Sequence, residues 1–256
     1  MKTKTWMSVC CMPALLSFVL LAGCGKKSEE QPAATPVASA PAAAPIDPAT
    51  AASVSGTVKL DGAAPKAAKI DMSTDPACKG TNMAENFVAT GGNLANVFVY
   101  VKEGLGTRTF DSPKDAITLD QSGCKYHPHV LGVMVNQTIK IVNSDPTTHN
   151  IHPTPKNNRD WNESQPPQSA PLEKTFAREE IMLPVQCNQH PWMHMFVNVT
   201  KIPFFAVTGP DGKFEIKGLP PGDYTIAFVH EKLGEQDVKV TLAAKDAKSV
   251  DATFKP

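Results

Sequence analysis

After residue 52, the hydrophobic positions fall in short runs that are rich in β-branched and aromatic residues and are bounded by Gly, Pro, Asn or Asp. This pattern is typical of strands joined by turns. Turns are marked by Asp61-Gly62, Pro210-Asp211-Gly212 and Leu219-Pro220-Pro221-Gly222, where glycine accepts a positive φ and proline presets its own φ. No run has the length and period of a long helix. The sequence therefore predicts an all-β protein.

The expected strands, in chain order, are 53–60, 96–102, 116–119, 130–135, 138–143, 172–176, 180–186, 195–201, 204–208, 213–217, 222–231, 236–242 and 250–254. The last part of the chain, "VTGPDGKFEIKGLPPGDYTIAFVHE" from Val207, resembles the carboxypeptidase regulatory-like, or transthyretin-like, β-sandwich family. That family opens with a strand like "VSGTVKLDGAAP", which here lies far upstream, at 54–65. The order implies a sandwich built from 53–103 with 203–256 and interrupted by a second β-domain at 110–201. Two consecutive domains are the alternative.

The N-terminal segment has the features of an export signal. Lys2 and Lys4 precede an apolar run, 14–22, which is too short to span a bilayer. The run ends in Leu21-Ala22-Gly23-Cys24, which resembles the bacterial lipobox, whose cysteine receives a lipid. The resemblance implies a lipoprotein signal peptide at 1–23, lipidation of Cys24 and a membrane anchor, with the rest of the chain in the periplasm or on the cell surface.

Residues 24–52 are dominated by Ala and Pro and contain few large apolar side chains, so we expect an extended tether in this segment. The formal net charge of the chain is +0. This balance gives no indication of a nucleic-acid partner.

The cysteine count leaves one thiol unpaired. Two of the six cysteines lie in the signal peptide and Cys24 is the lipid site, so Cys78, Cys124 and Cys187 remain. The simplest partition joins Cys78 to Cys124 in a disulfide, which an oxidising compartment permits. Cys187 is then free, and a metal is its most plausible use because a bare thiol there would oxidise.

Two motifs in the middle segment point to copper. "NSDPTTHNIH" begins at Asn143 and "CNQHPWMHM" begins at Cys187. Together they resemble the ligand loops of cupredoxins, and the second loop is most similar to that of amicyanin because a proline and an aromatic residue follow its first histidine. The resemblance covers about 116–201 and implies a Greek-key cupredoxin β-sandwich beside the transthyretin-like one.

The cupredoxin resemblance implies that one copper ion, cycling between Cu(I) and Cu(II), binds to His149, Cys187, His190 and Met193. A soft thiolate, two imidazoles and a weak thioether suit both oxidation states. Met195 stands at the spacing of plastocyanin-like loops and is the alternative axial ligand.

Other polar residues have secondary roles in this reading. Asn150 is expected to support the ligand loop by hydrogen bonding near the thiolate. His127, His129 and His152 could assemble a second metal site, but histidines that flank turns are common at protein surfaces, so their role stays open.

The function implied is electron transfer by an exported, lipid-anchored blue copper protein that is not an enzyme. In cupredoxins His190's counterpart shows one ring edge to solvent, which would make His190 the port for electrons from a cytochrome or another redox protein. Three alternatives remain. An oxidase or nitrite reductase needs further paired histidines, a copper carrier or storage protein would use the Met- and His-rich "HPWMHM", and the C-terminal sandwich could act as a scaffold or bind carbohydrate.

Overall fold

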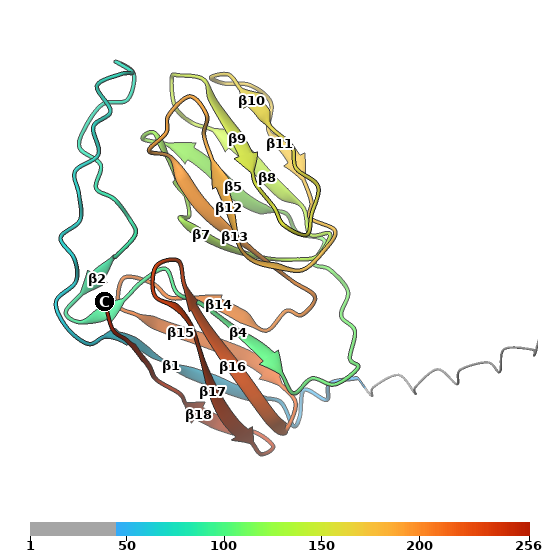
Figure 1. Cartoon of the computed structure of the whole chain (residues 1–256). Coiled ribbons are helices and arrows are strands. Elements are labelled where there is room, and N and C mark those ends of the chain that lie inside the picture. Colours follow the sequence, from blue (N-terminus) through green and yellow to red (C-terminus); the bar gives the residue numbers. More distant parts are fainter. Residues whose placement is uncertain (1–44) are drawn as a thin grey trace, which may run out of the picture. The chain divides into compact units, whose positions relative to one another are not determined.

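A computed structural model describes residues 45–256, which consist of strands and connecting loops (Figure 1). The prediction of an all-β protein is confirmed for these residues. The strands are β1 (Ala52–Leu60), β2 (Ala89–Thr90), β3 (Asn93–Leu94), β4 (Phe98–Glu103), β5 (Ile117–Ser122), β6 (Lys125–His127), β7 (Val130–Met134), β8 (Ile139–Asn143), β9 (His149–Pro153), β10 (Glu163–Gln165), β11 (Leu172–Lys174), β12 (Glu180–Gln186), β13 (His194–Thr200), β14 (Phe205–Val207), β15 (Lys213–Leu219), β16 (Gly222–His230), β17 (Gly234–Leu242), β18 (Ala247–Ser249) and β19 (Ala252–Phe254). Within 45–256 no helix has the length and hydropathy needed to cross a membrane.

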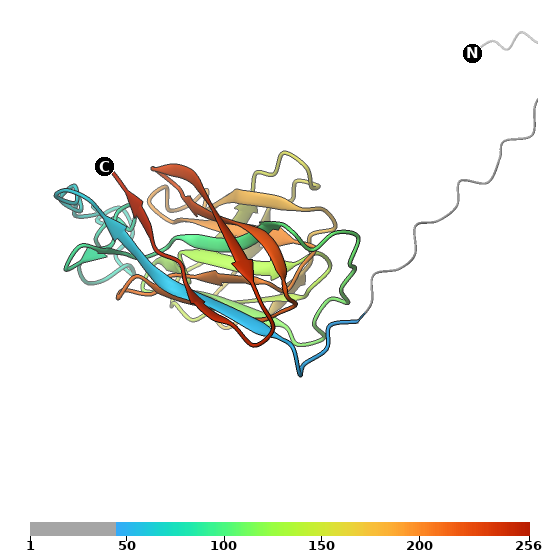
Figure 2. The same cartoon turned by 90° about the horizontal axis from the view of Figure 1, so that it is seen from below.

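The terminal sandwich is assembled from strands of both ends of the described chain, β1–β4 and β14–β19. One sheet has the order β15-β1-β3-β2, with β18 and β19 also paired to β1, and the other has the order β14-β4-β16-β17. Figure 2 shows the blue β1 beside the red C-terminal strands. Alternate residues of β1 and β15, such as Val54, Val58 and Ile216, enter the core because successive side chains of a strand point to opposite faces.

The central sandwich contains β5–β13. Its sheets have the orders β10-β9-β12-β13-β7 and β11-β8-β5-β6, in which β5 with β8 and β7 with β13 are parallel pairs. Leu183, Val197 and Ile141 are at most 1% exposed and belong to one core between these sheets. Strands β12 and β13 form an antiparallel pair in which Gln186 lies opposite His194, so the residues between them make a tight connection at one end of the sandwich.

The two sandwiches meet at β7 and β14. The position where a Cβ on Gly132 would stand lies 2.7 Å from the ring of Phe205 and 2.9 Å from that of Phe98. Only glycine leaves room for these rings, so a larger residue there would force the β7 strand away from the terminal sandwich.

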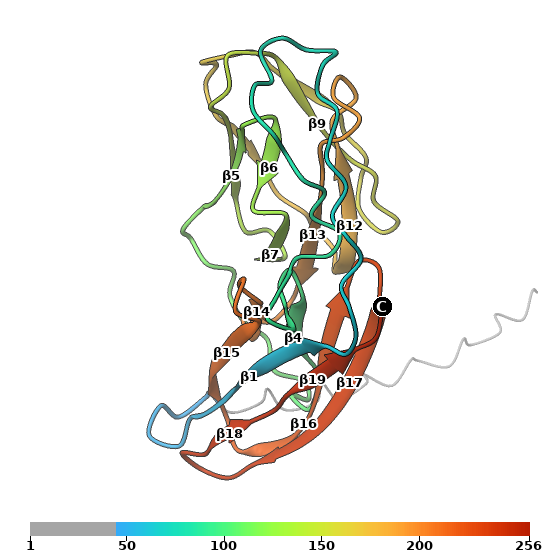
Figure 3. The ribbon, with the colours of Figure 1, turned by 90° about the vertical axis from the view of Figure 1, so that its left-hand side faces the viewer.

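The segment between β1 and β2 departs from the expected organisation. We expected 53–103 to belong to the terminal sandwich as a whole, but Met72 and Cys78 pack into the core of the central sandwich. Figure 3 shows this segment, in blue-green, running from β1 along the central sandwich to the level of β9. We name residues 66–84 the covering segment.

The start of the folded part also differs slightly from the expectation. Ile46 packs against the core of the terminal sandwich and β1 begins at Ala52, so the last residues of the expected 24–52 tether are folded. The expected signal peptide, the lipidation site Cys24 and the first part of the tether lie outside the described residues.

Candidate metal centre

Three of the expected ligands converge at one end of the central sandwich. His149 is the first residue of β9, Cys187 directly follows β12, and His190 lies in the connection to β13. Their ligand atoms all lie within 4.8 Å of one another. Nδ1 of His149 is 2.9 Å from Nδ1 of His190, which is 3.8 Å from the Cys187 sulfur. The three residues are 0–4% exposed, so solvent does not reach the ligand atoms freely.

The connection between β12 and β13 is held in a compact turn by its own backbone. The Cys187 amide donates to the Met193 carbonyl at 3.1 Å, and the Met193 amide donates to the His190 carbonyl at 2.9 Å. These two bonds bring the cysteine and the histidine, which have two residues between them, back to the same point.

Each histidine has a carboxylate on its far ring nitrogen. Nε2 of His149 is 2.8 Å from Asp145 Oδ2, and Nε2 of His190 is 2.9 Å from Asp75 Oδ2. An imidazole that donates Nε2–H to a carboxylate keeps its lone pair on Nδ1. The two lone pairs therefore face each other, beside a buried thiol.

The surroundings of His149 favour the form of the side chain that binds a metal. Burial is the largest influence on the pKa of His149 and lowers it, and the nearby His190 lowers it further, against the raising effect of Asp145. The neutral imidazole, which is the form that binds metals, is thus favoured at His149. Two imidazole lone pairs and one thiol in a buried position form a site for a cation that prefers nitrogen and sulfur ligands, such as copper or zinc.

Asn150 connects the two ligand loops. Its amide N–H lies 3.5 Å from the Cys187 sulfur, and its side-chain oxygen accepts from the Asn188 amide at 2.6 Å and lies 3.3 Å from the same sulfur. Its side-chain nitrogen donates to Asn162 at 2.6 Å. Asn150 therefore ties the start of β9 to the sulfur and to the residue that follows it.

Both candidate axial residues lie in the core next to the site. Met193 is 1% exposed and Met195 is 0% exposed, and both belong to the same core cluster as Cys187. Met193 is fixed beside the ligands by its backbone bonds, whereas Met195 lies within β13, opposite Val185. Both methionines therefore remain candidates for the axial ligand. Met193 lies in the same connection between β12 and β13 as Cys187 and His190.

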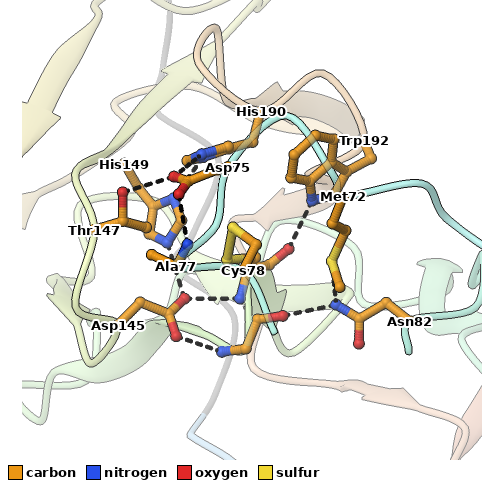
Figure 4. The surroundings of a disulfide bond; sticks show 12 residues. Met72, Asp75, Ala77, Cys78, Asn82, Asp145, Thr147, His149, His190 and Trp192 are labelled. Carbon is orange, nitrogen blue, oxygen red and sulfur yellow. Dashed lines mark hydrogen bonds and ion pairs between the residues drawn. A yellow bond between two sulfur atoms is a disulfide. The ribbon is translucent and has the colours of Figure 1, made fainter. Parts of the chain in front are cut away.

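A disulfide braces the centre from below (Figure 4). Cys78 and Cys124 are joined, the pairing that the cysteine count favoured. Cys124 lies in the turn between β5 and β6. Asp145 accepts hydrogen bonds from the amides of Gly123 and Cys124 in this turn, at 2.7 Å each, and so connects the turn to His149. The Trp192 indole donates to the Cys124 carbonyl at 3.1 Å. The braced turn therefore contacts both ligand loops.

The covering segment closes the edge of His190 that we expected to face solvent. His190 is 4% exposed, and Asp75 lies against its Nε2 and also accepts from Thr147 at 2.8 Å and from the Ala77 amide at 2.8 Å (Figure 4). The Ala77 amide is the largest influence on the pKa of Asp75, which these bonds lower. The expectation of an exposed His190 edge was wrong because a segment that precedes the central sandwich folds over it.

Asp75 and Asp145 are the residues that sequence reasoning missed. Asp145 had a local signal, because it stands four residues before His149 inside the first motif. Asp75 is 115 residues from His190 and only its position three residues before Cys78 hinted at a role.

The three histidines without a role do not come together. His127 lies 3.0 Å from the Ser122 carbonyl, and His152 lies 3.1 Å from Asn188 and 3.2 Å from Asp160. His129 is buried and lies 2.6 Å from Glu231.

Comparison with known proteins gave structural neighbours only. No family model and no curated protein matches the sequence. Among solved structures, the copper-containing nitrite reductase NirK of Thermus scotoductus SA-01 has a TM-score of 0.32 and 17% identity, and the match covers 50% of this chain and 27% of that one. The chain thus spans about a quarter of the length of this neighbour.

Two smaller neighbours match over a third of the chain. A purple cupredoxin from Nitrosopumilus maritimus has a TM-score of 0.29 and 22% identity, over 33% of this chain and 99% of its own. An oxidised amicyanin variant has a TM-score of 0.29 and 26% identity, over 33% of this chain and 81% of its own. These TM-scores are too low to decide function, which depends on the geometry of the centre.

Proposed function

We propose that this chain is a cupredoxin-like blue copper protein that transfers electrons. One copper ion would bind to Nδ1 of His149 and His190, the thiolate of Cys187 and the thioether of Met193. The observation that carries the proposal is the convergence of the two Nδ1 atoms and the sulfur in a buried position, with a carboxylate behind each imidazole. Copper in such a site supplies a one-electron Cu(I)/Cu(II) couple.

The protein's part in this function is to hold the donors still. Each histidine is fixed at its far nitrogen by a carboxylate, and each carboxylate is fixed by backbone amides. Asn150 restrains the sulfur, and the disulfide restrains the turn beneath. A site that changes little between two oxidation states exchanges an electron with little reorganisation, which is what a carrier requires.

The burial of the centre supports electron transfer over catalysis. An electron can cross a few ångströms of protein, whereas a substrate must contact the reacting atoms. With all three ligands at most 4% exposed, the described residues give a substrate no direct access. A copper carrier that hands on its metal would also need the ligands to be reachable, so burial argues against the carrier reading as well.

Electrons would enter through Trp192 in place of the covered His190 edge. The Trp192 ring is partly exposed and its centroid lies 5.0 Å from that of His190, and the exposed Pro191 lies next to it. A small apolar patch of this kind suits a brief encounter with a redox protein such as a cytochrome. Anchoring through Cys24 would keep both partners at one membrane, outside the cytoplasm.

The experiment is copper loading of the full chain in detergent, followed by reduction and reoxidation with a c-type cytochrome in a stopped-flow instrument. The proposal predicts an intense thiolate-to-copper absorption band that bleaches and returns as the cytochrome changes state. Cys187→Ser should lose the band because a hydroxyl is a poor soft ligand, whereas His152→Ala, which touches none of the ligands, should keep it. If the unaltered protein bound copper but did not show this band, electron transfer at this centre would be refuted.

A further inference from the structure

A second group of metal-ligating side chains lies where the two sandwiches meet. His129 precedes β7, His194 opens β13, and Glu231 follows β16 of the terminal sandwich. One ligand atom of each lies within 4.8 Å of the others. His129 Nε2 is 2.6 Å from Glu231 Oε1. The ring centroids of His129 and His194 are 5.5 Å apart, and the two rings lie edge to face.

One of the two imidazoles, that of His194, is oriented as a metal ligand usually is. Nδ1 of His194 lies 3.1 Å from the Trp192 carbonyl, which can only accept, so Nδ1 carries the proton and Nε2 keeps its lone pair. Nε2 of His129 is hydrogen-bonded to Glu231, so an ion there would take the place of the proton between them, and Nδ1 lies 4.0 Å from Glu85, beyond hydrogen-bond distance. A carbonyl or carboxylate behind the far ring nitrogen is the common support of a histidine that binds a metal.

The carboxylate of Glu231 is buried and only half satisfied. Its side chain is 1% exposed, and Oε2 has no hydrogen-bond partner among the described residues. The ammonium group of Lys232 is 3.7 Å from Oε2, beyond hydrogen-bond distance, and its side chain is 46% exposed, so it can turn to solvent. A buried carboxylate oxygen without a partner is costly, and a cation would satisfy it.

We propose that His129, His194 and Glu231 bind one divalent transition-metal ion, with Zn²⁺ as the best match. Two imidazoles and one carboxylate form a ligand set found in zinc sites that keep a fourth position for water or another ligand. The ligands come from both sandwiches, so the ion joins the terminal sandwich to the central one. His194 directly follows Met193, so the two metal centres share one short stretch of chain.

The simpler reading is an ion pair between protonated His129 and Glu231. That reading accounts for the 2.6 Å contact. It leaves Oε2 of Glu231 without a hydrogen-bond partner, and it gives His194 no part in the cluster.

The test is calorimetric titration of Zn²⁺ into the full chain in detergent, first loaded with one equivalent of Cu(II) so that the buried Cys187 centre is filled. We expect one further equivalent of Zn²⁺ to bind. Glu231→Gln and His129→Gln should each weaken this binding at least tenfold. The matched exposed changes Glu215→Gln and His127→Gln should leave it unaltered.

A second arm separates this inference from the proposed function. In the double variant His149→Gln/Cys187→Ser, which disables the first centre, one equivalent of Zn²⁺ should still bind, and adding Glu231→Gln should again weaken this binding at least tenfold. Absence of a further equivalent in the copper-loaded chain, or Zn²⁺ binding that ignores both Glu231→Gln and His129→Gln, would overturn the second site. Retained circular dichroism in the variants excludes unfolding as the cause of a loss.

Discussion

Removing the charge of Asp75 should raise the reduction potential of the proposed copper centre. Its carboxylate lies 2.9 Å from Nε2 of His190 and stabilises the more positive, oxidised state of an ion bound at Nδ1. Asp75→Asn keeps the size of the side chain and an oxygen that accepts hydrogen bonds, but removes the negative charge. The reduced state then gains relative to the oxidised one, and the potential rises.

The size of the effect follows from Coulomb's law. For charges roughly 7 Å apart across the imidazole and an effective dielectric constant of about 20, the interaction is about 2 kcal/mol. The side chain of Asp75 is 22% exposed, so screening by solvent reduces this to about 1 kcal/mol. For a one-electron couple that is a rise of about 40 mV, with about 90 mV as the upper bound.

Spectroelectrochemical titration of the copper-loaded chain measures this shift directly. The control is Asp71→Asn, which removes the same charge from an exposed position in the covering segment that contacts Ser73 and neither histidine. The control should shift the potential much less than Asp75→Asn. An unchanged or lowered potential in Asp75→Asn, or equal shifts in both variants, would show that Asp75 does not act on the centre through His190.

Three further predictions concern the axial ligand, the brace and acid stability. Met193→Leu should shift the absorption spectrum and raise the potential of the copper centre, whereas Met195→Leu should lower only the free energy of unfolding; the reverse pattern would make Met195 the axial ligand. Replacing both Cys78 and Cys124 by Ser should cost about 3–4 kcal/mol of unfolding free energy in denaturant titration, given a sequence separation of 46, and should speed oxidation by ferricyanide because the covering segment is released; an unaltered rate would count against its role as a cover. Burial raises the pKa of Glu180, but hydrogen bonds led by the Lys156 amide outweigh it and lower the pKa overall. The charged carboxylate therefore contributes stability above the unfolded pKa of about 4.3 that is lost as the pH falls through the lower folded value. Glu180→Gln should cost about 2 kcal/mol at pH 7 and progressively less below pH 4, and a pH-independent cost would refute this.

Most strands were predictable because their side chains alternate or are uniformly apolar. The strand β9, which carries His149, was not expected, because "HNIHP" has neither pattern. Four of its five residues are buried, β10 and β12 pair with it on both edges, and its polar side chains find specific partners. The short β6 and β10 were missed for a related reason, since pairing in the folded chain decides them more than local preference does.

The candidate site likewise has one part that the sequence predicts and another part that it does not. Cys187 and His190 are neighbours in sequence, and their spacing alone predicts that they meet. The covering role of Asp75 depends on how a distant segment folds over the centre, which no local pattern encodes. The group of His129, His194 and Glu231 likewise comes from three separate parts of the chain, so only the folded structure brings it together.

The measurement that tests the central claim most directly is the absorption and electron paramagnetic resonance spectrum of the full chain with one equivalent of Cu(II). The account predicts an intense band in the red and a narrow copper hyperfine splitting, both of which report a covalent bond between copper and the Cys187 thiolate. A pale protein with the wide splitting of ordinary cupric sites would contradict it, because Cu(II) would then be bound without the thiolate.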